Sequence, residues 1–213
     1  MRRITHADYT KYRRSPRDWL ESKVLPTGGH PVPGYRQAVA DSIYRFHRTR
    51  SEGIARAYLE NRLQRFENED RIQEAWDTFD SYVGWFANAD VDVADVRIGL
   101  NASVSSRLHL GGIVSRLDVT GRGYRAILFC SPYPTWLAES RFALIQYAIA
   151  LRYSRPMDAI DVGVQDLDGS GMVFRSYSLA RISAARRSFR EFEESVLEEA
   201  DHVPGATEWL SGP

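Results

Sequence analysis

The chain is poor in cysteine and has no long apolar run. Cys130 is the single cysteine among 213 residues, which excludes a disulfide framework and a zinc or iron–sulfur site held by several cysteines. No stretch of about 18 apolar residues occurs, so a membrane-spanning helix is not expected. The first residues also lack the apolar centre of a signal peptide. We therefore expect a cytoplasmic protein without a membrane partner.

Lysine is also scarce, although arginine is abundant. Lys11 and Lys23 are the only lysines, and the other 26 of the 28 basic residues are arginines. Such a bias is typical of a GC-rich genome, so the number of arginines does not by itself indicate phosphate binding. The absence has a chemical consequence, because no lysine after residue 23 is available to a catalytic site.

The formal net charge is zero, but the charges are segregated along the chain. Residues 1–65 carry 14 basic and 6 acidic side chains, and residues 101–190 carry 12 and 6. Residues 66–100 carry 2 basic and 9 acidic side chains, and residues 191–213 carry none and 7. The molecule can therefore have strong local fields without a net charge. The basic segment at the N-terminus favours DNA or RNA as a partner, whereas the acidic segments favour a protein partner.

Hydrophobic periodicity predicts helices first and strands later. Helices are expected over 5–24, with an N-cap at Thr5 and an interruption at Pro16, and then over 35–66, 70–87, 135–153 and 180–200. Alternating apolar residues predict strands within 95–119, 124–130, 158–167 and 171–179. This order predicts an α+β fold, or mixed α/β, in one compact domain. It has a helical N-terminal portion at 1–95, an α/β core at 96–200 and an irregular tail at 201–213.

Two phrases of the sequence match motifs of a known nuclease family. ITHADYTKYRRSPRDWL is similar to I-S-x-S-x-L-x-x-Y-x-x-C-P-x-x-Y/W-L, with Tyr12, Pro16 and Trp19 in place, and GIVSRLD at 112–118 is similar to G-x-I-D-R-x-D. The chain thus resembles the RecB-like branch of the PD-(D/E)XK nucleases, which are metal-dependent DNA nucleases. The resemblance implies a restriction-endonuclease-like core, a central mixed sheet flanked by helices, and a phage, defence or recombination context.

The resemblance fails at the catalytic residues themselves. Gly112, Arg116 and Asp118 fit the strand motif, but Ser115 stands where the family has its first metal-binding aspartate. The next strand, AILFCS at 126–131, offers neither the second acid nor the lysine. Two or three carboxylates are needed to hold Mg²⁺ or Mn²⁺ against a phosphate, and Asp118 alone is not enough. Ser15 replaces the cysteine of members with an iron–sulfur cluster, so we predict no metal, no cluster and no other cofactor.

The family resemblance suggests candidate catalytic residues, and the basic segments suggest candidate nucleic-acid contacts. The catalytic candidates are Asp118, His109 and Ser115, because these residues line or approach the expected nuclease cleft. The candidate nucleic-acid contacts are arginines, a lysine and aromatic residues that can hold phosphates and stack on bases: Lys11, Arg13, Arg14, Arg17, Tyr12, Trp19, Arg116 and Tyr147. His47 is a structural histidine or a displaced metal ligand, with the structural role favoured.

Three functions remain open from the sequence. The first is a nuclease-fold protein that has lost its chemistry and acts by binding nucleic acid or a protein partner. The second is an enzyme in which the old cleft has been rebuilt around His109, Asp118 or their neighbours. The third is a divergent Mg²⁺-dependent nuclease whose acids come from Asp95, Glu139 or Asp161. Because the lysine and two acids are missing, we favour a protein that is not an enzyme.

Overall fold

The computed structural model describes residues 2–24, 34–105, 107–131 and 135–211. In these ranges, eight α-helices surround one six-stranded mixed sheet, which confirms the predicted α+β class. The strands are β1 (Arg2–Thr5), β2 (Asp92–Ser103), β3 (Leu108–Val119), β4 (Tyr124–Phe129), β5 (Ile160–Gln165) and β6 (Val173–Arg175). The helices are α1 (His6–Tyr12), α2 (Pro16–Val24), α3 (Tyr35–Thr49), α4 (Glu52–Leu63), α5 (Glu69–Asn88), α6 (Ser140–Arg152), α7 (Leu179–Ala200) and α8 (Ala206–Ser211).

The long strand β3 is the centre of the sheet. β2 pairs antiparallel with it along one edge, while β1 and β4 share its other edge. β1 runs parallel to residues 108–111 of β3, and β4 runs antiparallel to residues 116–119. The sheet continues through β5, parallel to β4, and ends at β6. A parallel pair needs a long crossover connection, and α6 provides it between β4 and β5.

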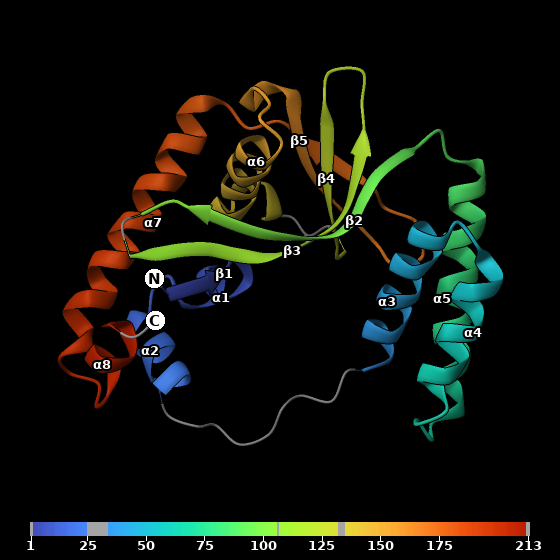
Figure 1. Ribbon diagram of the computed structural model, residues 1–213, viewed down its shortest axis with the longest axis horizontal. Helices are drawn as coiled ribbons and strands as arrows, with labels where there is room; N and C mark the ends of the chain where they lie inside the picture. Colours follow the sequence, from blue (N-terminus) through green and yellow to red (C-terminus); the bar gives the residue numbers. More distant parts are fainter. Residues whose placement is uncertain (1, 25–33, 106, 132–134, 212–213) are drawn as a thin grey trace.

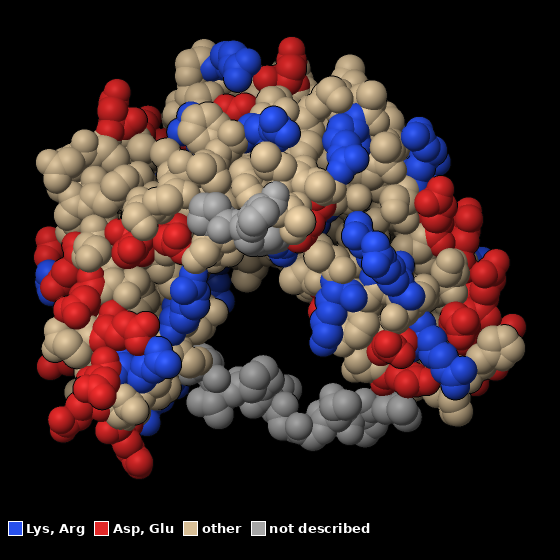
Figure 2. Space-filling view, turned by 180° about the vertical axis from the view of Figure 1, so that it is seen from behind, with Lys and Arg blue, Asp and Glu red and all other residues tan. Residues whose placement is uncertain are grey.

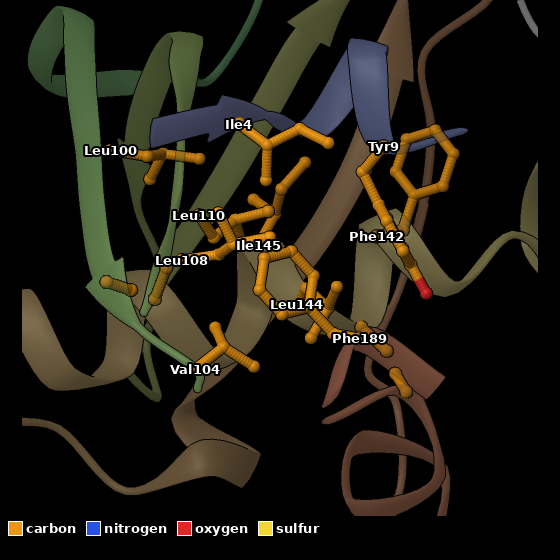
Figure 3. Close-up of a cluster of buried hydrophobic side chains, with 14 of the residues drawn as sticks. Ile4, Tyr9, Leu100, Val104, Leu108, Leu110, Phe142, Leu144, Ile145 and Phe189 are labelled. Carbon is orange, nitrogen blue, oxygen red and sulfur yellow. The ribbon is translucent and has the colours of Figure 1, made fainter. Parts of the chain in front are cut away.

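The helices divide into two groups at opposite ends of the sheet (Figure 1). One group contains α3, α4 and α5, and the other contains α1, α2, α7 and α8, with the chain termini close together. The second group packs on a large apolar core that includes Ile4, Leu110, Phe142, Leu144 and Phe189 (Figure 3). The first group has its own smaller core. We call these the apolar core and the α3–α5 core.

Most elements form where the sequence predicts them, but several boundaries differ: the helix expected over 35–66 is divided into α3 and α4, and the helix expected from 135 begins as α6 at Ser140. Thr5 is the N-cap of α1 and accepts a hydrogen bond from the Asp8 backbone N–H at 3.0 Å, as expected. The helix predicted from residue 5 is preceded by β1, a four-residue strand that forms only by pairing with the distant β3. The tail is not irregular throughout, because α8 forms and its Trp209 packs edge-on against Trp19 at 5.7 Å between ring centroids.

A buried carboxylate fixes the loop between β2 and β3. Glu193 of α7 accepts hydrogen bonds at Oε1 from the Ser105 hydroxyl at 2.8 Å and from the backbone N–H groups of Arg107 and Leu108 at 2.6 and 2.7 Å. These donors would otherwise lose their water partners without replacement. The contact ties the last long helix to the start of β3.

Candidate nucleic-acid interface

Asp118 forms a buried, bidentate ion pair with Arg116. The two residues lie two positions apart on β3, and their side chains are 2% and 0% exposed. Arg116 Nε is 2.6 Å from Asp118 Oδ1, and Nη2 is 3.0 Å from Oδ2. Paired parallel hydrogen bonds of this kind are among the strongest that side chains make. Both carboxylate oxygens are therefore engaged by an internal guanidinium and are not presented to a metal ion.

Two residues of the helical group extend this ion pair. Arg116 Nη1 donates to the Tyr82 hydroxyl of α5 at 2.8 Å, and that hydroxyl is 2.7 Å from His47 Nε2 of α3. Because arginine has donors only, the Tyr82 oxygen accepts from Arg116 and its proton is donated to His47. The Trp85 ring lies 5.0 Å from the Arg116 guanidinium carbon, a cation–π distance. The favoured structural role of His47 agrees with these contacts.

Burial shifts the pKa values of His47 and Tyr82. Desolvation and, to a smaller extent, the positive charge of Arg116 lower the pKa of His47 to about 3. Burial also raises the pKa of Tyr82 to about 12, although the neighbouring Arg116 acts in the opposite direction. Both groups are thus neutral at physiological pH, as the hydrogen-bond directions require. Arg116 and Asp118 carry the two charges, and they cancel.

Ser115 holds two elements together instead of facing a cleft. It is buried, and its hydroxyl accepts a hydrogen bond from the Phe129 backbone N–H of β4 at 2.9 Å. The Tyr44 hydroxyl of α3 is also hydrogen-bonded to Ser115. No base activates Ser115 among the described residues, so the geometry gives no support to a nucleophilic role.

The end of β4, where the nuclease family has its second acid and its lysine, is occupied by other residues. Ala126, Ile127 and Leu128 are buried core residues. Burial raises the pKa of the Cys130 thiol, although the charges of Arg141 and Arg36 oppose this effect. The next residue, Ser131, donates a hydrogen bond to Asp166. Cys130 is therefore a half-buried thiol with two arginines near it, one from α6 and one from α3.

The alternative acids do not gather in one place. Asp161 is mostly buried and lies 3.5 Å from Arg122, while Glu139 forms an ion pair with Arg141 at 2.7 Å. Asp95 accepts a hydrogen bond from the Val96 backbone N–H. No group of three or more potential metal ligands of the His, Cys, Asp and Glu type occurs in the part of the chain that the structure describes.

His109 and Asp118 do not share a site. They are nine residues apart on the same strand, which corresponds to about 30 Å at the rise of an extended chain. His109 Nδ1 lies 3.2 Å from the Ser103 hydroxyl of β2 instead. A rebuilt active site that uses both residues is therefore excluded by their separation.

The candidate nucleic-acid contacts fall into buried and exposed sets. Trp19 is fully buried against Phe192 and Trp209, and Arg116 is fully buried in its ion pair, so neither can touch a nucleic acid. Those two expectations were wrong because both side chains are needed inside the fold. Tyr147 is half-buried beneath the Arg186 guanidinium, 4.4 Å from its ring centroid. The remaining candidates lie on α1, on α2 and in the turn between them, which contains Arg13 and Arg14.

The exposed cations of α1 and α2 differ in their partners. Arg17 forms an exposed ion pair with Glu21 at 2.9 Å. Lys11 lies over the half-buried Tyr12 ring, 4.6 Å from its centroid. Arg13 and Arg14 are exposed, and no acid of the described residues lies within ion-pair distance of either. These two arginines are accordingly the most available phosphate contacts of the predicted set.

The surface charge is arranged around a hollow. Figure 1 places α1 and α2 across from α3. Figure 2 shows the molecule hollowed between these two sides, with Lys and Arg on both walls and Asp and Glu mainly on the outer faces. A basic concavity with acidic outer faces concentrates its positive potential inward.

Sequence reasoning missed the ion pair and its partners. An Arg and an Asp two residues apart on a buried strand point to the same face, and this spacing was a sufficient signal for the pair. Tyr82 was not singled out within the helix predicted over 70–87, because nothing local marks its hydroxyl as a partner of a strand arginine.

No protein-family model matches the chain, and no curated protein sequence is similar to it. In the described ranges, no helix combines the length and apolarity that crossing a bilayer requires.

Proposed function

We propose that this protein is a nuclease-fold protein that binds nucleic acid in its basic hollow without cutting it. The observation that carries the proposal is the closed ion pair: Asp118, the one acid that fits the nuclease motif, gives both oxygens to Arg116. A metal ion would have to displace a guanidinium from a buried site, and among the described residues no second carboxylate stands beside it to compensate.

The order of the elements supports the nuclease-like part of the proposal. β2, β3 and β4 form an antiparallel meander, α6 crosses over, and β5 returns parallel to β4. A central mixed sheet flanked by helices is the arrangement that the sequence resemblance implies. The part played by nucleic acid is supported by the basic walls of the hollow in Figure 2. It is also supported by Arg13 and Arg14, which are exposed and form no ion pair with an acid of the described residues.

A protein partner is the second candidate, and the acidic outer faces favour it. α5 presents Glu69, Asp70, Glu74 and Asp77 to solvent, and the exposed surface of α7 carries Glu191, Glu194 and Glu198. These faces would repel a nucleic acid and attract a basic protein surface. Both partners can bind together, since the two kinds of surface are separate.

A salt series in a DNA- and RNA-binding assay tests the proposal. We expect affinity to fall linearly with salt on a double-logarithmic plot, by a slope of about 0.7–0.9 for each phosphate contact. Arg13→Ser combined with Arg14→Ser is expected to reduce that slope by about 1.4–1.8. The control is Arg122→Ser, which also removes an exposed arginine, with a side chain 72% exposed. It lies in the turn between β3 and β4, a hairpin that points away from α1, α2 and α3 in Figure 1.

Two outcomes would contradict nucleic-acid binding in the hollow. One is an affinity that is absent or does not change with salt. The other is an Arg122→Ser variant that weakens binding as much as the double variant does, because a general loss of positive charge would then explain both results.

A further inference from the structure

Three arginines converge on a small surface pocket between α3, α4 and β2. Arg45 and Arg48 stand three residues apart on α3, and Arg97 comes from β2. Asp41, Tyr44, Thr49 and Tyr58 complete the wall of a cavity of about 190 Å³. The pocket shares no residue with the α1 and α2 cations discussed above.

The pocket has a surplus of positive charge. Its one carboxylate, Asp41, is already engaged, because Oδ1 accepts from Gln37 at 2.8 Å and Oδ2 lies 3.5 Å from Arg62. No acid in the described ranges lies within ion-pair distance of Arg45, Arg48 or Arg97. Three arginines therefore line the pocket with a single carboxylate, and that carboxylate is shared with Arg62.

Two of the three side chains are held in place by other contacts. The Arg45 guanidinium lies over the Tyr58 ring at 4.8 Å from its centroid, and Arg62 approaches the same ring at 6.0 Å. Arg48 Nη2 donates to the Val96 carbonyl at 3.4 Å. Each arginine keeps further N–H donors free, since a guanidinium has five. Holding the charges in advance reduces the entropy cost of binding a ligand.

The third arginine has a strained backbone. Arg97 has φ of 55°, in the left-handed region that residues other than glycine rarely occupy. The neighbouring residues Val96 and Ile98 pair with Arg116 and Val114 of β3, while Arg97 itself has no partner in the register. A strained residue that a fold retains is often part of a functional site. Here the distortion accompanies a guanidinium that lines the pocket.

The size and charge of the pocket select its ligand. A volume of 190 Å³ corresponds to about six water molecules, which is below the 300–1,000 Å³ of pockets for drug-sized ligands. Guanidinium groups match the oxygen geometry of phosphate. We propose that this pocket binds a terminal phosphate group, either inorganic phosphate or the phosphate of a mononucleotide whose remaining atoms lie outside. The proposal does not depend on the proposed binding of nucleic acid in the hollow.

The test is calorimetry at constant ionic strength, with inorganic phosphate and adenosine monophosphate as the two probes. Arg97→Gly removes one guanidinium and suits the left-handed backbone, so the variant is expected to fold at least as well as the wild type. Arg50→Gly is a matched control, because Arg50 is exposed, has φ of 53° and does not line the pocket. Thermal unfolding of all three proteins checks that each is folded.

We expect one saturable phosphate site in the wild type, weakened about tenfold or more by Arg97→Gly and unchanged by Arg50→Gly. Binding of both probes assigns a monoester, and binding of phosphate alone assigns the free ion; either result supports the phosphate pocket. Absence of saturable binding, or equal losses in the two variants, overturns it. Displacement of phosphate by an oligonucleotide without a terminal phosphate also overturns it, since the pocket would then hold backbone diesters.

The phosphate and nucleic-acid proposals can fail separately. The Arg13→Ser and Arg14→Ser variant is expected to keep its phosphate site. Conversely, Arg97→Gly is expected to keep the salt-dependent binding of nucleic acid.

Discussion

The apolar core and the α3–α5 core are built on different principles. The apolar core is filled by aliphatic and aromatic side chains from the sheet, α1, α6 and α7, and its buried polar residues, such as Gln146 and Glu193, satisfy backbone groups at its rim. The α3–α5 core instead lies against an ion pair, a tyrosine and a histidine that bond to one another. The first kind of core depends on area and packing, whereas the second also depends on every polar partner being present.

The largest effect is expected from a cavity in the apolar core. Phe142 is fully buried, and Phe142→Ala should lower the free energy of unfolding by about 4 kcal/mol, because it loses transfer energy and leaves a void. Denaturant unfolding measures the change. A loss below about 1 kcal/mol would contradict the dense packing assigned to this core.

A slightly smaller loss is expected from breaking the buried ion pair. Asp118→Asn keeps the shape but leaves the Arg116 charge without compensation, at a cost of about 3 kcal/mol. Glu21→Gln, which breaks the exposed pair with Arg17, is the control and should cost less than about 0.5 kcal/mol.

The double variant Arg116→Met with Asp118→Leu sharpens the comparison. Replacing both charges by apolar side chains of similar size should restore stability to within about 1 kcal/mol of the wild type. If the double variant is as unstable as Asp118→Asn, the ion pair itself stabilises the fold. The loss in Asp118→Asn would then be more than the cost of leaving the Arg116 charge uncompensated.

The pH dependence should distinguish the two cores as well. Burial lowers the pKa of His47 to about 3 and that of His6 to about 4, from 6.5 in the unfolded chain. The unfolded state then binds more protons below pH 6.5, so the stability from these neutral histidines is present above 6.5 and is lost as the pH falls toward their folded pKa values. Each histidine should contribute a slope of about 1 kcal/mol per pH unit in that range.

His47→Gln separates the contribution of His47, in the α3–α5 core, to the pH dependence of stability from that of His6. The glutamine can still accept from the Tyr82 hydroxyl but does not titrate, so the slope between pH 6.5 and 4 should decrease by about one proton equivalent. Unfolding measured across this range provides the check. An unchanged slope would show that His47 is protonated in the folded state, against the hydrogen-bond pattern.

Local patterns in the sequence were sufficient for the fold class and for most elements. The stripe through Ile72, Trp76 and Phe79 predicted α5 within one residue at each end, and alternation predicted β3 and β4. β1 was missed because its four residues become a strand only by pairing with β3 about a hundred residues away. Such non-local pairing leaves no local signal.

The candidate site was predictable only in part, and for the same reason. The missing acids and lysine are visible in the sequence, so the loss of metal chemistry is a prediction from the sequence, which the cleavage assay below tests. The closure of Asp118 by Arg116 needed the strand spacing, and the contacts with Tyr82 and His47 needed the fold. Trp19 looked available for stacking on bases because its burial depends on Phe192 and Trp209, which lie far along the chain.

The central claim is that the hollow binds nucleic acid while the place of the metal-binding acids is closed. The most direct measurement incubates labelled single- and double-stranded DNA with the protein and Mg²⁺ or Mn²⁺, and resolves bound and cleaved products in parallel. We predict DNA that is bound and remains intact. Metal-dependent cleavage by the wild type that disappears in the folded Arg116→Met, Asp118→Leu variant would contradict the account.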